Sequence, residues 1–595
     1  MATRTEPREN PSHEGGSAQR TIGALWLDAV GRGGPEPAYL DEREGSWQEV
    51  GLDEAAARVE AMANGLLARG IRKGDAFALL ATTSLEWALF DFALALVGAV
   101  SAGIYPNSSP GDVRYIVEHS ESVGVLVENE EQRMKLEGTD SDHVLTFADL
   151  LALEAQGRAY ATEHPTALAE RTATIREDDL FTYIYTSGTT GPPKACLITH
   201  RNYYAMTATI DGLDDFIVAG DVMLLYLPLA HNFGRLMHLS GPYAGFTIAF
   251  LADPLRIAEA LPQVRPTVLP SVPRVYEKVY AAVSAQFAAA TGVKRRIVDF
   301  ALATGRAVSE LRREGRPLPR GLALRHRLAD RLVYSKVKER LGGRLRIGIS
   351  GGAPLAQEVA EFFHALDILI LEGYGLSECT TAATVNRPSS FRFGTVGPAL
   401  PGCELRIDDD GEILIRSETV FGGYLKDEEA THAVLTEDGW LRSGDLGTLE
   451  DGFLRITDRK KDIIITAGGK NVAPQNIENA LKATRLVSQA LVVGDRRPYV
   501  SALLTLDEAA AQAWAEQRGV DPAEASMSPE LRQELQRAVD GVNAGLSRFE
   551  QVKRFAVLPR DFSADHDEVT PTLKLKRRVC EAHFAAELEE LYRST

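Results

Sequence analysis

A short hydroxyl- and glycine-rich segment carries the strongest chemical signal in this sequence. Residues 185–194 read Tyr-Thr-Ser-Gly-Thr-Thr-Gly-Pro-Pro-Lys and directly follow an apolar, β-branched run. Glycines let successive backbone N–H groups converge on anionic oxygens, hydroxyls donate further hydrogen bonds, and a lysine adds a point charge. We therefore predict a polyphosphate-binding loop at the end of a strand. A Walker A loop is excluded because Pro193 stands where the second glycine belongs, and a plain turn is the alternative interpretation of this loop taken alone.

Further motifs follow this loop in a fixed order. They are residues 350–355 (Ser-Gly-Gly-Ala-Pro-Leu), 374–378 (Tyr-Gly-Leu-Ser-Glu), 439–445 (Gly-Trp-Leu-Arg-Ser-Gly-Asp) and 458–462 (Asp-Arg-Lys-Lys-Asp). Together with the first loop they resemble the motifs of the adenylate-forming (AMP-dependent) synthetase superfamily. That superfamily includes acyl-CoA synthetases, aryl-CoA ligases, firefly luciferases and the adenylation domains of peptide synthetases. The resemblance extends from about residue 25 to residue 590.

The resemblance implies a role for each matched residue in binding ATP and Mg²⁺. The phosphate loop is expected to use Thr186, Ser187, Gly188, Thr189, Thr190, Gly191 and Lys194. The adenine and α-phosphate are expected to lie against Gly351, Gly352, Ala353, Tyr374, Gly375 and Ser377. Glu378 matches the carboxylate that holds magnesium, a hard cation that prefers oxygen ligands. Asp445 and Arg459 match the residues that contact the ribose.

The C-terminal region matches the moving part of the same superfamily. A change in composition after residues 458–462 indicates a domain boundary, and the resemblance implies a hinge there with Lys461 at its pivot. Gly469 matches the glycine that leaves room for the pantetheine arm of coenzyme A. Lys574 matches the catalytic lysine, but Leu573 replaces the usual glycine before it, so Lys576 is the competing candidate.

Narrower features resemble bacterial long-chain fatty acyl-CoA synthetases. They are residues 227–231, residues 271–278 and a basic helical insert. The sequence departs from that branch at Gly234-Arg235, where Glu-Arg is common. His231 is therefore either a gate residue beside the acyl group or a satisfied, partly buried histidine.

The resemblance implies an enzyme that activates a medium- or long-chain fatty acid through an acyl-adenylate. It then forms the coenzyme A thioester and releases AMP and pyrophosphate, with Lys574, Glu378 and Thr186 as catalytic residues. Two alternatives within enzymology are a ligase that loads a carrier-protein thiol and a coenzyme A ligase for aryl or other carboxylic acids. A third is an inactive protein that binds nucleotide or acyl groups, because fold does not guarantee chemistry.

The elements that must position these residues belong to the α/β class. Short apolar runs at residues 76–80, 123–127, 180–185, 222–227, 247–251, 344–349 and 368–371 alternate with helical patterns, such as a buried helix over residues 85–100. A hairpin is expected from residues 490–493 and 499–506, and a last strand near residues 554–558.

The expected organisation has four parts. We predict a disordered tail (1–20), a large multi-subdomain N-terminal adenylate-forming domain of sheets packed with helices (21–457), a hinge (458–461) and a small mobile α+β C-terminal lid domain (462–595).

Composition limits the partners. The 595 residues carry a net charge of −18, which argues against a nucleic-acid partner. The longest uncharged apolar stretch has about fourteen residues, too few to span a bilayer. Residues 294–346 hold sixteen basic and five acidic residues, which suits either a solvated helix pair or peripheral contact with an anionic membrane. A cytoplasmic location is expected, and a homodimer is one option for the oligomeric state.

Overall fold

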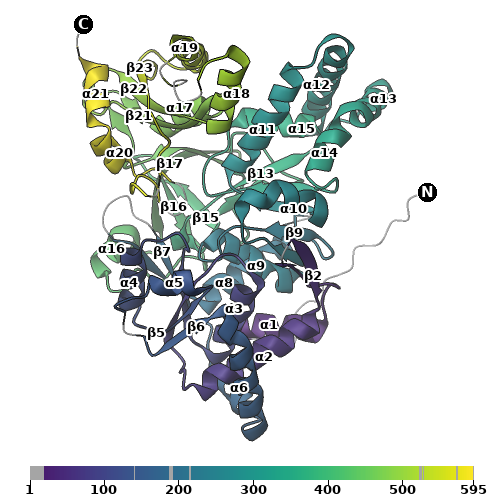
Figure 1. The fold of residues 1–595 in the computed structure, drawn as a ribbon, viewed down its shortest axis with the longest axis vertical. Helices are drawn as coiled ribbons and strands as arrows, with labels where there is room; N and C mark the ends of the chain where they lie inside the picture. The colour runs from purple at the N-terminus through teal and green to yellow at the C-terminus, as the bar shows by residue number, and fades with distance from the viewer. Residues whose placement is uncertain are drawn as a thin grey trace.

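The protein consists of a large N-terminal part built on layered sheets and a smaller C-terminal part packed against one end of it (Figure 1). The computed structural model describes residues 19–43, 45–139, 141–186, 192–213, 216–521, 526, 528–563, 565–570 and 574–593. Most of the predicted tail and residues 187–191 of the predicted phosphate loop lie outside the described residues.

Two large sheets form the framework of the N-terminal part. The first has the order β14 (Thr384–Val385), β13 (Leu369–Tyr374), β12 (Ile347–Ser350), β11 (Val268–Ser271), β9 (Val222–Leu225), β10 (Thr247–Phe250), β1 (Tyr39–Arg43) and β2 (Ser46–Val50). The second has the order β6 (His143–Thr146), β5 (Ser122–Val127), β3 (Ala76–Leu80), β4 (Val100–Ile104), β7 (Leu180–Thr186) and β8 (Lys194–Thr199). Central strands such as β3 and β4 pair in parallel and are buried along their whole length, which explains their uninterrupted apolar sequences.

Helices cover the faces of these sheets (Figure 1). The N-terminal part contains α1 (Ile22–Arg32), α2 (Leu52–Ala68), α3 (Leu85–Val97), α4 (Pro110–His119), α5 (Glu130–Met134), α6 (Leu150–Glu163), α7 (Ala167–Ala173), α8 (His200–Ala208), α9 (Asn232–Ala244), α10 (Ile257–Val264), α11 (Pro273–Ala288), α12 (Gly292–Arg313), α13 (Arg320–Ala329), α14 (Ser335–Arg340), α15 (Gln357–Ala365) and α16 (Glu428–Val434). Single turns η1 (Phe147–Asp149), η2 (Thr209–Gly212), η3 (Pro254–Arg256) and η5 (Ser377–Cys379) and the π-helical segment η4 (Asp330–Tyr334) complete it.

A four-stranded antiparallel sheet ends the N-terminal part and leads into the C-terminal part. Its order is β15 (Glu404–Ile407), β16 (Glu412–Arg416), β17 (Leu441–Glu450) and β18 (Phe453–Arg459). The main buried cluster of the N-terminal part ends at Leu454, and the next cluster begins at Ile464. The predicted hinge at residues 458–461 falls between these two cores.

The C-terminal part is a small α+β unit. It contains the two-stranded β19 (Ile464–Ile465) and β20 (Asn471–Val472), and the three-stranded β21 (Val487–Val493), β22 (Val500–Leu506) and β23 (Val552–Val557). Its helices are α17 (Pro474–Lys482), α18 (Glu508–Arg518), α19 (Pro529–Asn543), α20 (Arg577–His583) and α21 (Ala585–Tyr592).

The structure confirms the predicted α/β class and most of the expected strands. The predicted hairpin is the antiparallel pair β21 and β22, and the predicted last strand is β23. The buried helix α3 ends at Val97, three residues before the expected end, because Gly98 adopts a left-handed φ of 75° and caps it. Among the described residues, no helix is both long enough and apolar enough to cross a membrane.

A buried ion pair joins α3 to α9 inside the N-terminal core. Arg235 and Asp91 are both fully buried and ion-paired, and Arg235 Nη1 also donates to the hydroxyl of Thr182 at 2.6 Å. The guanidinium carbon lies 4.5 Å from the ring centroid of Phe181. Gly234, which stands where the branch commonly has a glutamate, has no room for a side chain, because a Cβ there would lie 2.5 Å from the carbonyl oxygen of Pro228.

We expect Arg235→Met to destabilise the N-terminal part by about 3–5 kcal/mol, because Asp91 would remain as a buried charge without its partner. The shift of the urea unfolding midpoint measures this loss. The double variant Asp91→Leu/Arg235→Met is expected to recover much of it. Equal destabilisation by the single and double variants would contradict this explanation.

Candidate active site

One cleft of about 1620 Å³ gathers most of the predicted site residues. Both the N-terminal and the C-terminal parts contribute to its wall. The predicted residues that border it are Thr186, Lys194, His231, Gly351, Gly352, Ala353, Tyr374, Gly375, Ser377, Glu378, Asp445, Arg459, Lys461 and Lys574. Segments separated by almost 400 positions in the sequence therefore meet around a single space.

Asp445 is held at one corner of the cleft by two neighbours. Antiparallel pairing of β17 with β18 puts Asp445 directly opposite Arg459, whose Nε lies 3.5 Å from Oδ1. The hydroxyl of Tyr374 donates to Oδ2 at 2.7 Å. Burial raises the pKa of Asp445, while the charge of Arg459 and the hydrogen bond from Tyr374 oppose that rise. An oriented carboxylate in this setting could accept hydrogen bonds from a pair of vicinal hydroxyls.

Lys574 enters the same cleft from the C-terminal part. Its pKa falls to about 8, chiefly because protein atoms crowd the ammonium group and also because Arg459 is nearby, while Asp445 and Glu378 oppose the shift. Lys574 is exposed over the residue as a whole, but the crowding acts at its ammonium group, and the environment of that group sets the pKa.

This shift predicts a pH dependence for ATP use. A cationic Lys574 is present below the lowered pKa and is lost as the pH rises through about 8. We therefore expect kcat/KM for ATP to fall on the alkaline side well before the ordinary lysine pKa of about 10.4. Lys574→Arg, whose side chain stays charged, should remove this alkaline limb from the profile. An unchanged limb in that variant would assign the titration to another group.

Glu378 is fixed beside the end of the predicted phosphate loop. It lies in η5, and the hydroxyl of Tyr424 donates to its Oε1 at 2.6 Å. Lys194 lies 5.4 Å over the ring of Tyr424 and forms an ion pair of 2.8 Å with Asp427. Thr186 faces Lys194 across the β7–β8 pair and donates its hydroxyl hydrogen to the carbonyl oxygen of Lys194 at 3.3 Å. The segment around Tyr424 therefore ties the loop to the carboxylate.

A glycine is required where the predicted adenine-binding strand turns. A Cβ at Gly375 would lie 2.0 Å from the carbonyl oxygen of Thr381 and 2.5 Å from the Cα of Ala382. No side chain can be accommodated at such distances. Gly375 thus lets β13 end in a tight turn that brings Tyr374 and Glu378 to the same cleft.

His231 borders the cleft and also caps a helix. It is the N-cap of α9, and its Nδ1 accepts a hydrogen bond from the backbone N–H of Phe233 at 3.1 Å. Burial, aided by the charge of Lys574, lowers the pKa of His231 to about 4, so the ring is neutral at pH 7. The capping bond accounts for one ring nitrogen, and the cleft position still allows the predicted gate role.

Part of the cleft that His231 borders has an apolar wall, which the sequence motifs did not predict. One face of α9 lines it with Phe233, Leu236, Met237 and Ser240, whereas Arg235 on the opposite face points into the core. The spacing i, i+3, i+4, i+7 is the signal that could have indicated this face. The rest of the wall comes from Tyr105, Met206, Ile210, Leu213, Phe216 and Ile217.

Two other predicted positions lie away from the chemistry in this conformation. Gly469 is exposed in the turn between β19 and β20 with a φ of +69°, and open space surrounds its Cβ position. Lys576 forms an ion pair with Asp567 instead of bordering the cleft. Of the two candidate lysines, the structure brings only Lys574 to the other predicted site residues.

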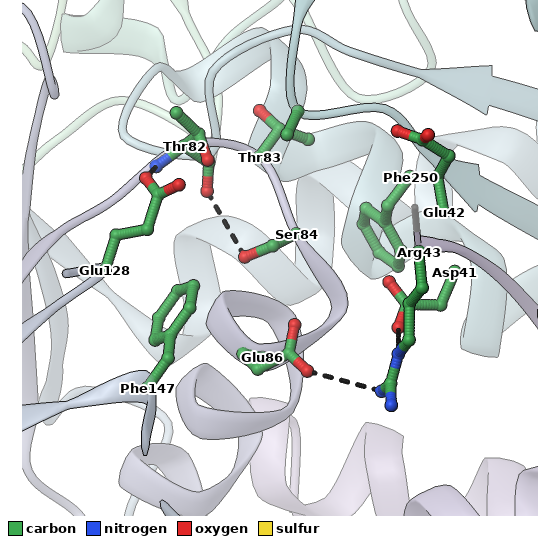
Figure 2. A pocket seen from close by; sticks show the side chains of 11 residues that line it. Asp41, Glu42, Arg43, Thr82, Thr83, Ser84, Glu86, Glu128, Phe147 and Phe250 are labelled. Carbon is green, nitrogen blue, oxygen red and sulfur yellow. Dashed lines mark hydrogen bonds and ion pairs between the residues drawn. The ribbon is translucent and has the colours of Figure 1, made fainter. Parts of the chain in front are cut away.

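A second pocket, of about 220 Å³, is lined mainly by charged and hydroxyl-bearing residues and shares no lining residue with the large cleft. Figure 2 shows Arg43 between Asp41 and Glu86, at 2.7 Å and 3.6 Å. Glu128 accepts a hydrogen bond from the backbone N–H of Thr82 at 2.9 Å. Because its charged groups are paired with one another or with the backbone, we assign the chemistry to the large cleft.

Comparison with known proteins agrees with this geometry. Residues 28–425 match the family described as AMP-binding enzyme, and residues 461–595 match the AMP-binding enzyme C-terminal domain. The chain is 40% identical over 568 residues to the long-chain-fatty-acid–CoA ligase FadD15 of Mycobacterium bovis, covering 92% of this chain and 93% of that protein. It is 30% identical over 601 residues to the peroxisomal long chain acyl-CoA synthetase 7 of Arabidopsis thaliana, covering 92% and 82%. In fold it resembles the adenylation domain of a carboxylate reductase from Mycobacterium chelonae, with a TM-score of 0.74, 24% identity and coverage of 96% and 91%.

Proposed function

Because the chain belongs to the AMP-binding enzyme family, we propose that it is a long-chain-fatty-acid–CoA ligase that works through an acyl-adenylate. The observation that carries this proposal is the meeting of Lys574, Asp445, Arg459 and Glu378 with a long apolar wall in one cleft. Identity of 40% to a relative named for long-chain fatty acids supports the same substrate class.

The first step joins the fatty carboxylate to the nucleotide. A carboxylate oxygen attacks the α-phosphorus of ATP, the bond to the β-phosphate oxygen breaks, and pyrophosphate leaves. Both reactants are anions, and two unit charges 4 Å apart repel by about 4 kcal/mol at an effective dielectric constant near 20. Lys574 and Lys194 supply positive charge in the cleft, and Asp445 orients the ribose so that attack is in line.

The residues present fit a magnesium ion that is held mainly by the phosphate oxygens of ATP. Mg²⁺ commonly uses one or two carboxylates together with phosphate oxygens and waters. Glu378 offers one carboxylate, oriented by Tyr424 through Oε1, and no cluster of three acidic, histidine or cysteine ligands exists among the described residues. When bound, the ion would neutralise charge on the phosphates.

The second step transfers the acyl group to the thiol of coenzyme A. The thiolate attacks the acyl carbon, the bond to the phosphate oxygen breaks, and AMP leaves. We propose that rotation about Lys461 withdraws Lys574 and brings the exposed Gly469 turn to the entrance used by the pantetheine arm. In this proposal His231 is the gate beside the acyl carbonyl, a role supported by its neutral ring and its position on the cleft next to the apolar wall.

The product nucleotide tests this proposal directly. Incubation with ATP, coenzyme A and a fatty acid should release AMP and pyrophosphate in equal amounts with the acyl-CoA. Comparing fatty acids of increasing length with aromatic acids identifies the preferred acid. Comparing coenzyme A with a phosphopantetheinylated carrier protein identifies the acceptor. Release of ADP and orthophosphate with every acid would overturn the proposal.

The apolar wall predicts how chain length can be changed. Ser240 is buried on the cleft-facing side of α9, nine residues or roughly 13 Å of helix beyond His231. We expect Ser240→Phe to lower kcat/KM for hexadecanoate by at least about tenfold, because a filled pocket rejects the extra methylenes. Octanoate should be used almost normally, and Ser240→Ala should use both acids. An equal loss for the two acids in Ser240→Phe would contradict this placement of the chain.

A cytoplasmic location, a homodimer and peripheral contact of residues 294–346 with an anionic membrane remain parts of this proposal. The positive charge of that segment within an acidic chain supports the membrane contact.

A further inference from the structure

Helices α12 and α13 project from the body of the N-terminal part (Figure 1). They contain most of the basic segment at residues 294–346, in a chain whose net charge is −18. The helices are connected through residues 314–319, and they pack against each other. A projecting helix pair of opposite charge to the rest of the surface is suited to contact a partner.

One side of α13 holds the helix to the protein. Ala329 is buried, and His326 lies 3.9 Å from Asp367. The guanidinium carbon of Arg325 lies 5.2 Å from the ring centroid of Phe300 on α12. This side is therefore already used for intramolecular packing.

The opposite side of α13 is exposed, together with Arg331 in the following segment η4, and we call this surface the α13 face: Arg320, Leu324, Arg327, Leu328 and Arg331. At 100° per residue the four positions on α13 fall within an arc of roughly 100°. Leu324 is 69% exposed and Leu328 50% exposed, side by side at i and i+4. The arginines are exposed, and none of the three forms an ion pair with a described residue.

Several other basic residues of the segment form ion pairs within the protein. Arg295 pairs with Asp299 at 2.9 Å, Arg312 pairs with Asp367, and Lys338 contacts Asp330 and Asp367 at 2.9 Å and 2.8 Å. Among the basic residues of the segment that form no ion pair with a described residue, Arg320, Arg327 and Arg331 share a face with the two exposed leucines, whereas others, such as Lys294 and Arg306 on α12, lie elsewhere. Charge and apolar area thus coincide on the α13 face.

We propose that the α13 face docks the enzyme reversibly on a bilayer that contains anionic lipids. Leucines flanked by arginines match a membrane surface, because the apolar side chains can enter the acyl boundary while the guanidinium groups meet headgroup phosphates. A nucleic acid offers phosphates but no apolar layer, so it would leave Leu324 and Leu328 without partners. The acidic remainder of the chain is repelled by such a bilayer, which favours the orientation with α13 toward the membrane.

Vesicle flotation with the full-length protein tests this inference. The vesicles are phosphatidylcholine alone or phosphatidylcholine mixed with phosphatidylglycerol. A basic residue near an anionic surface strengthens binding roughly fivefold, so Arg320→Glu/Arg327→Glu/Arg331→Glu should weaken binding to the mixed vesicles by at least about 100-fold. Leu324→Ser/Leu328→Ser should remove the part of the binding that resists high salt.

A matched control changes the net charge equally at other exposed sites. Arg72→Glu/Arg133→Glu/Arg496→Glu should bind the mixed vesicles like the parent protein, because these exposed residues lie outside the α13 face: Arg72 between α2 and β3, Arg133 in α5 and Arg496 between β21 and β22. Absence of vesicle binding by the parent protein, or equal weakening by the two triple variants, would overturn the proposal.

This inference extends the proposed fatty-acid activation, and the two can fail separately. AMP release with octanoate in the absence of vesicles should be unchanged in the α13 variants, and their thermal unfolding midpoints should match the parent protein. Loss of AMP release in the parent protein would remove the proposed ligase function and leave vesicle binding standing. Binding of duplex DNA by the parent protein with no binding of mixed vesicles would replace the bilayer by a nucleic acid.

Discussion

Lys574→Ala is expected to slow acyl-adenylate formation by about 10²- to 10³-fold, the scale for loss of one preorganised charge stabiliser. Lys574 is the group that the C-terminal part inserts beside Asp445, Arg459 and Glu378. Its charge can offset the charge that moves toward pyrophosphate as the α-phosphate bond breaks. Thioester formation from supplied acyl-adenylate should largely survive, because that step releases AMP and needs no charge at the pyrophosphate position.

Two separate assays measure the effect of Lys574→Ala on each step. Acid-dependent exchange of pyrophosphate into ATP reports the first step, and acyl-CoA formation from acyl-adenylate reports the second. Lys576→Ala is the matched control, because Lys576 lies two residues away and pairs with Asp567 outside the cleft. Similar losses in both steps would contradict the assigned role, and a loss caused by Lys576→Ala would move the role to that lysine.

Gly469→Leu is expected to spare pyrophosphate exchange and to abolish acyl-CoA formation. In the conformation described here Gly469 is exposed and its Cβ position has open space around it, so the adenylation conformation leaves room for a side chain to begin there. After the proposed rotation the same turn would line the entrance for pantetheine, where a side chain fills the path of the thiol arm. The defect should therefore be confined to the second step.

Backbone strain must be separated from obstruction at this position. Gly469 has a φ of +69°, where any L side chain costs roughly 1–2 kcal/mol. Gly469→Ala carries the same strain with much less volume, so it serves as the control and should retain a large share of acyl-CoA formation. Normal turnover with coenzyme A in Gly469→Leu would remove this turn from the thiol path.

Local sequence was sufficient to predict most of the strands and to recognise the ordered motifs. The fully buried strand β3 appears as an uninterrupted apolar run, because both faces of a central parallel strand are covered. The hydroxyl- and glycine-rich residues before Lys194 could be singled out because phosphate binding restricts residue type at single positions. The family was identifiable for the same reason.

Contacts between distant segments were not predictable in this way. Tyr424 orients Glu378 from 46 residues away, and no local pattern indicates that bond. The apolar wall along α9 and the burial of Arg235 against Asp91 likewise depend on how α3, α8 and α9 pack.

Residue type and short spacing therefore indicated the phosphate loop, and the resemblance of the ordered motifs supplied the candidates for metal and ribose binding, because those requirements act within one turn or one strand end. Tertiary structure alone decided which lysine reaches them, which face of α9 borders the cleft and which face of α13 is left without a partner. Such choices follow from packing among segments far apart in the chain, where burial is shared and no single stretch of sequence fixes the outcome.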